Sequence, residues 1–331
     1  MALGAVAWHL RQRGRLTGQV ALVMGASRGL GLLIAREFAR KGCKVVICAR
    51  DAGELGRARE DLERRGADVL AEPCDVTDRE QVARVVSLAR ARFGRVDILC
   101  NVAGIIQVGP VESMTIEDFE NAMKVMFWGV LYPTLEVLPE MMERRGGRIV
   151  NITSIGGKVA VPHLLPYTAA KFAAVGLSEG LRAELRRFGV KVVTIVPGLM
   201  RTGSFVNAYF KGRQEKELAW FALGASLPGV SMSARRAARQ IVAAAASGRS
   251  VKVLSAPAKL LALFHGIFPG LTTELLGLAN SLLPAAEGGS RENVTGMEVS
   301  RRPGVVVGRA LRLAMSASSK RLHQYPGPKV A

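Results

Sequence analysis

QVALVMGASRGLGLLIAREFARK, residues 19–41, is the stretch that decides the fold. An unbroken apolar run, 19–24, passes directly into a turn that carries Gly25, Gly29 and Gly31, and an amphipathic pattern over 30–41 follows. A buried strand, a glycine-rich turn and a helix in this order are typical of dinucleotide sites. The glycines let the backbone approach a pyrophosphate, whose charge the helix N-terminus stabilises. The spacing, G-x-x-x-G-x-G, differs from the commoner G-x-G-x-x-G, but its place between strand and helix favours dinucleotide binding over a plain tight turn.

The same alternation of strand and helix patterns continues to about residue 254. Six more apolar runs predict strands, at 44–49, 68–74, 96–100, 148–153, 191–196 and 250–254. Most of these runs are continuous rather than alternating, as expected of strands that are buried on both faces of a parallel sheet. Amphipathic stretches such as 78–93 and 167–188 separate them. We therefore predict one α/β domain over 17–254, a doubly wound parallel Rossmann sheet of about seven strands with helices on both faces.

Two arginines stand where a phosphate on the ribose 2′ position would lie. Arg28 is inside the glycine-rich turn, and Arg50 directly follows the second predicted strand, with Asp51 one residue later. An acidic residue at the end of this strand binds the ribose 2′-hydroxyl, whereas an arginine accommodates a 2′-phosphate. The two arginines therefore favour NADP(H) over NAD(H) as the cofactor.

Tyr167 and Lys171 lie four residues apart in a predicted helix, so their side chains share one face. A tyrosine pKa is near 10. An ammonium about 4 Å away is worth roughly 4 kcal/mol at an effective dielectric near 20, enough to lower that pKa by about 2–3. Ser154 ends the fifth predicted strand, and strand ends of this kind line the ligand crevice. The three residues predict a site where Ser154 holds a carbonyl oxygen while Tyr167 exchanges a proton with it.

Taken together, these motifs resemble the short-chain dehydrogenase/reductases, in their compact single-domain branch. The matching elements are GASRGLG (25–31), CDV (74–76), NVAG (101–104), Ser154, YTAAK (167–171) and PGLMRT (197–202). They cover about residues 17–255 in the order and spacing of that family. The resemblance implies a Rossmann sheet, reversible hydride transfer between a nicotinamide and a carbonyl or alcohol, and a homo-oligomer.

The resemblance also assigns roles to residues. Ser154 would orient the substrate, Tyr167 would be the acid/base, and Lys171 would bind the nicotinamide ribose and lower the tyrosine pKa. Asp75 and Val76 would flank the adenine, Asn101 and Gly104 the central cofactor wall, and Thr202 with the backbone after Pro197 the carboxamide. The full expected cofactor set is Gly25, Ser27, Arg28, Gly29, Leu30, Gly31, Arg50, Asp75, Val76, Asn101, Ala103, Gly104, Tyr167, Lys171, Pro197, Gly198 and Thr202.

The chain departs from the family pattern at two methionines. Met24 stands where many members have a structural threonine before the first glycine. Met126 stands where the family has an asparagine that holds a water of the proton relay, and a thioether cannot replace that amide. An NADP(H)-binding homologue with weak or no activity, in a regulatory or membrane-surface role, is therefore the alternative to an enzyme.

The formal net charge of +19 exceeds what a phosphate-bearing cofactor requires. Such a charge attracts polyanions in general, so an anionic membrane surface stays open as a partner. Aromatic residues are only 5%, without basic-aromatic interleaving, and we therefore expect no nucleic-acid partner. The four cysteines, Cys43, Cys48, Cys74 and Cys100, form no metal-ligand pattern with the four histidines. We expect reduced buried thiols, no metal, and a lipophilic small molecule as substrate.

The two ends of the chain extend beyond the predicted domain. Residues 1–16 are an apolar and then basic extension, the reverse order of a secretory signal, and no apolar run reaches about 20 residues. These features predict a cytoplasmic protein, either free or bound peripherally to a membrane. Residues 255–286 predict two short apolar helices broken at Pro269-Gly270, which form a lid over the substrate, an interfacial membrane hairpin or a dimer arm. Residues 287–331 are basic and predicted to be poorly ordered. His163 either lines the pocket or is an ordinary loop histidine.

Overall fold

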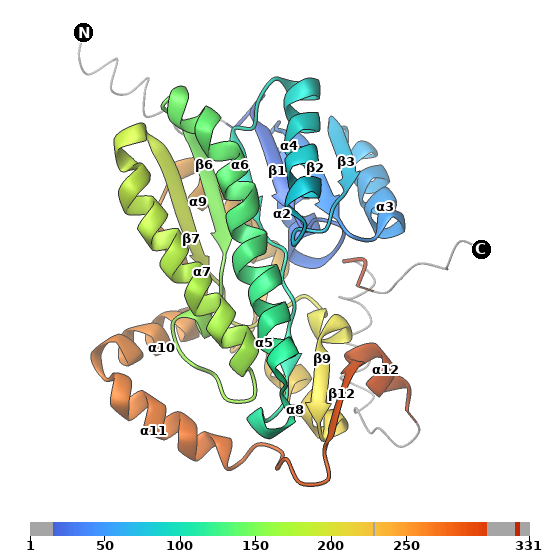
Figure 1. The fold of residues 1–331 in the computed structure, drawn as a ribbon, viewed down its shortest axis with the longest axis vertical. Coiled ribbons are helices and arrows are strands. Elements are labelled where there is room, and N and C mark those ends of the chain that lie inside the picture. Colours follow the sequence, from blue (N-terminus) through green and yellow to red (C-terminus); the bar gives the residue numbers. More distant parts are fainter. Residues whose placement is uncertain (1–15, 228, 303–321, 325–331) are drawn as a thin grey trace.

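A parallel seven-stranded sheet forms the centre of the computed structural model, which describes residues 16–227, 229–302 and 322–324 (Figure 1). Residues 1–15 of the predicted N-terminal extension and most of the predicted tail beyond 302 lie outside this range. The strand order is β11-β7-β6-β4-β1-β2-β3. The strands are β1 (Val20–Met24), β2 (Lys44–Ala49), β3 (Val69–Pro73), β4 (Ile98–Asn101), β6 (Gly147–Ile152), β7 (Val190–Val196) and β11 (Val251–Val253). Every pairing between them is parallel, and the predicted Rossmann sheet is confirmed.

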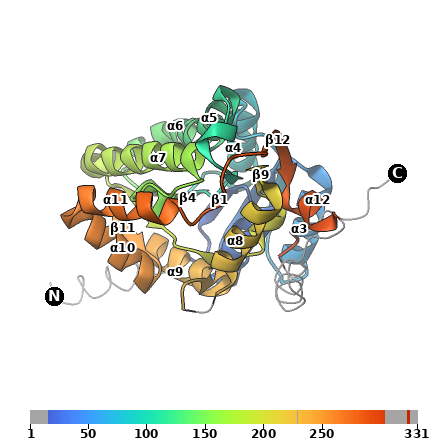
Figure 2. The ribbon, with the colours of Figure 1, turned by 90° about the horizontal axis from the view of Figure 1, so that it is seen from below.

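Helices cover both faces of this sheet, as the view from below in Figure 2 shows. One face carries α2 (Gly29–Arg40), α3 (Ala52–Glu63) and α9 (Ala234–Ser247), and the other carries α4 (Arg79–Phe93), α6 (Gly129–Glu143) and α7 (Leu165–Glu184). Alternate residues of β1 enter two different cores: Val23 packs with the α2 side, and Leu22 with the α4 side. Since each buried aliphatic side chain contributes about 1.5–3 kcal/mol, both faces must be apolar, which explains the unbroken apolar runs.

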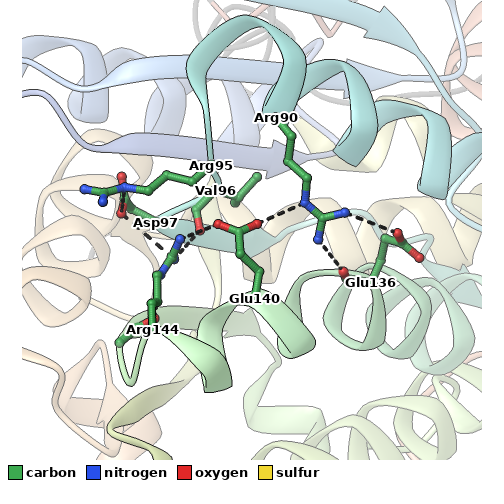
Figure 3. A network of polar contacts seen from close by, with 8 residues as sticks. Arg90, Arg95, Val96, Asp97, Glu136, Glu140 and Arg144 are labelled. Atoms are coloured by element: carbon green, nitrogen blue, oxygen red, sulfur yellow. Dashed lines mark hydrogen bonds and ion pairs between the residues drawn. The ribbon is translucent and has the colours of Figure 1, made fainter.

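A network of charged residues joins α4 to α6 (Figure 3). Glu140 on α6 accepts from Arg90 Nε on α4 at 2.9 Å and is also paired with Arg144. Arg144 reaches Asp97, just before β4, and Arg95 lies 2.9 Å from the same carboxylate. Single exposed ion pairs contribute about 0–1 kcal/mol each, and shared partners raise that value. The network holds the two helices together at the amino ends of the strands.

A small three-stranded sheet extends the domain beyond the carboxyl ends of the main strands. Its order is β12-β9-β5, and a two-stranded pairing joins β8 to β10. The elements are β5 (Gln107–Val108), β8 (Met200–Arg201), β9 (Tyr209–Gly212), β10 (Met232–Ser233), β12 (Ser290–Thr295), α8 (Gln214–Ser226) and α12 (Gly296–Arg301). The prediction of poor order from residue 287 is wrong for β12 and α12. Antiparallel pairing with β9 and burial of Val294 and Val299 hold them in place.

The remaining helical elements surround the cleft or leave the domain. Short segments are η1 (Val111–Ser113), η3 (Ile155–Gly157), η4 (Leu185–Phe188) and η5 (Ser204–Asn207), and α5 (Ile116–Met123) leads into a π-helical turn, η2 (Lys124–Trp128). Residues 256–280 form α10 (Ala256–Ile267) and α11 (Pro269–Asn280), which lie along the lower left edge in Figure 1. In the described part of the chain, no helix is both long and apolar enough to cross a membrane.

Candidate active site

A cleft of about 520 Å³ opens at the carboxyl ends of the central strands. Loops that follow β1, β2, β3, β4, β6 and β7 all contribute to its lining. Among the predicted catalytic and cofactor residues, those that line the cleft are Gly25, Ser27, Arg28, Gly29, Leu30, Gly31, Arg50, Asp75, Val76, Ala103, Gly104, Ser154, Tyr167, Lys171, Pro197, Gly198 and Thr202. Asn101 is the predicted residue that does not line it.

The glycine-rich turn is tight because side chains are excluded from it. Gly25 has a φ of +89°, and a Cβ there would stand 2.7 Å from Ala103 Cα. A Cβ on Gly31 would stand 2.0 Å from the Gly25 carbonyl oxygen. The turn therefore brings the first residues of α2 directly against the end of β1. This arrangement leaves a backbone-lined concavity at a helix N-terminus, which fits the pyrophosphate of a dinucleotide.

Residues near the C-terminus lie against this turn. The Gly29 amide donates to the Leu322 carbonyl oxygen at 2.8 Å, and a Cβ on Gly29 would stand 2.6 Å from Gln324 Nε2. Gln324 also lines the cleft, where Asn207 Nδ2 donates to its side-chain oxygen at 2.8 Å. No local pattern in the sequence indicates the contact between Gly29 and Leu322, because these positions lie almost three hundred residues apart.

At the end of the cleft beside α3, the two arginines have different surroundings. Arg28 Nη1 lies 2.6 Å from Glu54 Oε1, and the Ser27 hydroxyl donates to the other oxygen of Glu54 at 3.0 Å. Arg50 is exposed and has no ion-pair partner among the residues that the structure describes. Asp51 is the N-cap of α3 and accepts from the Glu54 amide at 2.7 Å. Glu54 is a buried carboxylate in the cleft lining that the sequence did not predict. In the sequence it is indistinguishable from an ordinary acidic residue in the first turn of a helix.

The prediction that Asn101 forms part of the cofactor wall is wrong for its side chain. Asn101 is buried, and its Nδ2 donates to Asn151 Oδ1 at 2.9 Å. A longer contact of 3.3 Å joins it to Thr134 of α6. As the last residue of β4, Asn101 directs its amide sideways and towards α6, so it ties β4 to β6 below the cleft. The backbone at Ala103 and Gly104 forms the wall instead.

The residues predicted to be catalytic meet on one wall of the cleft. Ser154 caps η3, and its Oγ accepts from the Gly156 amide at 3.0 Å. A Cβ on Gly156 would stand 3.2 Å from Tyr167 Cε1, so the glycine lets the phenol ring lie close to the serine. One turn further along α7, Lys171 Nζ donates to the Ile152 carbonyl oxygen at 3.0 Å and lies 5.7 Å from the centre of the Tyr167 ring.

The pKa values of this group differ from the sequence-based expectation. Burial raises the pKa of Tyr167 above its usual value, and the hydrogen bond with Ser154 acts in the opposite direction. Burial lowers the pKa of Lys171 to about 8. The net direction for Tyr167 is therefore opposite to the lowering predicted from its spacing to Lys171, because loss of water disfavours the phenolate. Tyr167 thus carries its proton at neutral pH.

Met126 lies in the π-helical turn between α5 and α6 and is completely buried. Its Cγ and Sδ, and Lys171 Nζ, each lie 3.7 Å from the point where a Cβ on Gly104 would stand. Met126 therefore borders the cleft wall beside the lysine. Its thioether offers no donor and only a weak acceptor there.

His163 is absent from the cleft lining. Its Nδ1 lies 2.8 Å from Glu217 Oε1, and Trp220 Nε1 donates to the other carboxylate oxygen at 2.7 Å. His163 and Glu217 are both buried, so this histidine belongs to the packing between α8 and the loop before α7.

Known proteins with a similar sequence or a similar fold include dehydrogenases and reductases. The sequence profile described as short chain dehydrogenase matches residues 19–210, more than half of the chain. The oxidoreductase UcpA of Escherichia coli is 38% identical over 190 residues, 57% of this chain and 72% of that protein. A short-chain dehydrogenase from Streptomyces avermitilis has a TM-score of 0.68 and 32% identity, covering 80% of this chain and 98% of that one. A variant of actinorhodin polyketide ketoreductase, crystallised with NADPH, has a TM-score of 0.63 and 28% identity, covering 72% and 97%. The chain belongs to the short-chain dehydrogenase family.

Proposed function

We propose that this chain is an NADP(H)-dependent oxidoreductase that moves a hydride between the nicotinamide and a carbonyl or alcohol of a lipophilic molecule. The observation that carries the proposal is that Ser154, Tyr167 and Lys171 lie on one wall of the cleft that the glycine-rich turn also lines. A bound nicotinamide would supply the hydride. The protein must then hold the substrate oxygen and supply or remove one proton there.

The hydrogen bonds of the site suit Tyr167 and Ser154 to these tasks. The Ser154 oxygen accepts from the Gly156 amide, so its hydroxyl proton, which is also near Tyr167, can be donated to a substrate oxygen that enters between the two side chains. Tyr167, whose pKa burial raises above its usual value near 10, keeps its proton at neutral pH and can donate the proton that a reduced carbonyl oxygen requires. Lys171 spends one N–H on Ile152 and has others to donate to a ribose hydroxyl.

Preference for the phosphorylated cofactor is supported mainly by Arg50. Its guanidinium lies at the cleft lining without a described acidic partner, and a 2′-phosphate would provide one. Arg28 supports the preference less strongly, because Glu54 already neutralises it at 2.6 Å. The related actinorhodin ketoreductase was crystallised with NADPH. The net charge at this end of the cleft therefore depends on Glu54 as well as on the arginines.

A lipophilic substrate is supported by the side chains that continue the cleft beyond Tyr167. The cleft lining includes four apolar side chains here: Ile105 and Ile106 after β4, Met200 in β8, and Ala208 just before β9. Apolar walls with a few polar groups at the reacting atom are typical of sites that select by shape and hydrophobicity.

A panel of ketones with NADPH tests this proposal. Purified protein should oxidise NADPH with long-chain or bicyclic ketones and act much less on short hydrophilic ones. Direct titration should give a lower Kd for NADPH than for NADH. Turnover that favours small polar carbonyls would contradict the lipophilic assignment, and equal Kd values would contradict the cofactor assignment.

The second candidate is a protein that binds NADP(H) without turnover, and Met126 is the observation that favours it. A buried thioether and Lys171 Nζ both lie 3.7 Å from the point where a Cβ on Gly104 would stand, and the family's asparagine would hold a water of the proton relay in place of this thioether. This candidate predicts NADPH binding with no oxidation of NADPH by any ketone of the panel. Turnover of even one ketone, lost in Tyr167→Phe, would rule it out.

A further inference from the structure

The helices α10 and α11 expose apolar side chains on a scale unusual for a surface hairpin. In these two helices only Ala258 and Thr272 are buried. The exposed large apolar side chains of the hairpin, with Phe268 between the helices and Leu282 just after them, have these exposed fractions: Leu260 (68%), Leu263 (62%), Ile267 (59%), Phe268 (49%), Leu271 (52%), Leu275 (49%), Leu278 (70%) and Leu282 (87%). A lid packed on the core would bury these side chains. Large continuous apolar surfaces of this kind mark places where another partner binds.

The hairpin carries almost no charge of its own. Within 255–286 the charged side chains are Lys259 and Glu274, with His265 between them. Each helix has 12 residues and is therefore about 18 Å long, short of the roughly 30 Å hydrocarbon core of a bilayer. The helices are apolar enough to enter an apolar phase and too short to cross one. An element of this kind can lie in the plane of a membrane interface.

A basic cleft of about 480 Å³ lies where the segment that follows the hairpin meets the residues at the start of α8. Gly288 and Ser290 line it together with Arg213, Lys216 and Arg302, and Glu215 is its one acidic member. Arg213 is held towards the segment after the hairpin, because its Nε donates to the Glu287 carbonyl oxygen at 2.9 Å. The hairpin and the strands β9 and β12 all lie at the lower end of the molecule in Figure 1. Apolar and cationic surfaces thus share one end of the protein.

From this combination we propose that the protein docks on an anionic lipid bilayer. The exposed leucines of α10 and α11 enter the interface, and the basic cleft faces the phosphates of the headgroups. Arg213, Lys216 and Arg302 complement the negative charge of lipid phosphates, and this complementarity selects an anionic bilayer as the partner of this end of the protein.

The base of the hairpin also contacts the active-site cleft. A Cβ on Gly198 would stand 2.7 Å from Ser255 Oγ and 3.0 Å from Ala258 Cβ, and Gly198 lines the cleft. A docked protein would therefore hold its active site close to the lipid phase. The docking itself does not depend on the proposed oxidoreductase function.

Sedimentation of the full chain with vesicles tests the proposal. The probes are vesicles of phosphatidylcholine alone and of phosphatidylcholine with phosphatidylglycerol, at low and high salt. We expect the protein to pellet with the anionic vesicles at low salt, and less at high salt or with neutral vesicles. Leu263→Gln combined with Leu278→Gln should weaken binding by more than about tenfold, because both side chains are exposed and leave the fold intact. Lys216→Gln combined with Arg302→Gln should weaken binding to anionic vesicles by about fivefold per charge.

A matched pair of substitutions elsewhere controls for general surface hydrophobicity. Leu88 on α4 and Leu135 on α6 are also exposed, and Leu88→Gln combined with Leu135→Gln should leave vesicle binding unchanged. The proposal is overturned if the wild-type protein stays in the supernatant at low salt, or if the hairpin variant binds as well as the wild type. It is also overturned if light scattering shows that the hairpin variant dissociates an oligomer while vesicle binding persists, because a second copy then covers the hairpin.

Discussion

Replacing Met126 with asparagine separates the enzyme from the non-catalytic homologue. Met126 is completely buried, so loss of its thioether end should lower the free energy of unfolding by about 2–4 kcal/mol. A buried amide without a partner would cost a further 1–3 kcal/mol or so. Lys171 Nζ lies near the same point beside Gly104 as the thioether, and an amide that reaches one of its N–H groups would avoid this second cost. We therefore expect the free energy of unfolding to fall by about 2–4 kcal/mol, without the further cost of an unpaired amide. We also expect turnover to rise about tenfold, as it should if proton transfer limits the rate.

Denaturant unfolding and steady-state NADPH oxidation measure the two effects on the same preparation. Met126→Leu is the control, because a volume-conserving swap costs under about 1.5 kcal/mol and adds no amide. It should leave turnover unchanged. A folded Met126→Asn protein that binds NADPH normally but turns over no faster would refute the idea that the methionine limits proton transfer.

Arg50→Asp should reverse the preference for NADPH and change the ratio of the Kd values for NADPH and NADH by about ten- to a hundredfold. Glu54→Gln should strengthen NADPH binding, because it frees Arg28 from its ion pair. Titration of both variants with both cofactors measures these Kd values, and an unchanged ratio in Arg50→Asp would contradict the role of Arg50. The rate of reduction should fall as pH rises, first near 8 where Lys171 loses its proton and again above 10 where Tyr167 does, and a pH profile with a single fall near 7 would contradict the raised tyrosine pKa. Asn101→Ala should lower the free energy of unfolding by about 1–3 kcal/mol without changing NADPH affinity, because its amide binds Asn151 outside the cleft; weaker NADPH binding in the folded variant would return it to the cofactor wall.

The sheet could be predicted because its strands are buried on both faces. A strand such as β1 must then be apolar at every position, which is visible in one sequence without knowledge of its neighbours. The spacing of Tyr167 and Lys171 was equally local, since one helical turn separates them. Ser154 could be added because strand ends of a parallel sheet meet at one edge.

The features that the sequence did not predict depend on burial or on contacts between residues far apart in the chain. Glu54 reaches Arg28 only after α3 packs beside α2, and Gln324 reaches the glycine-rich turn from the far end of the chain. The direction of the Asn101 side chain is set by Asn151 on the next strand. The pKa of Tyr167 depends on how much water the folded site excludes, whereas helical spacing indicates only that Lys171 is near.

Tyr167→Phe tests most directly whether the Tyr167 hydroxyl passes the proton. The substitution removes one oxygen and leaves the ring that packs beside Gly156. Single-turnover oxidation of bound NADPH with a saturating ketone should slow by about 10²–10⁴-fold, while the Kd for NADPH stays within about twofold of the wild-type value. A Phe variant that binds NADPH and reduces the ketone at nearly the wild-type rate would contradict the account.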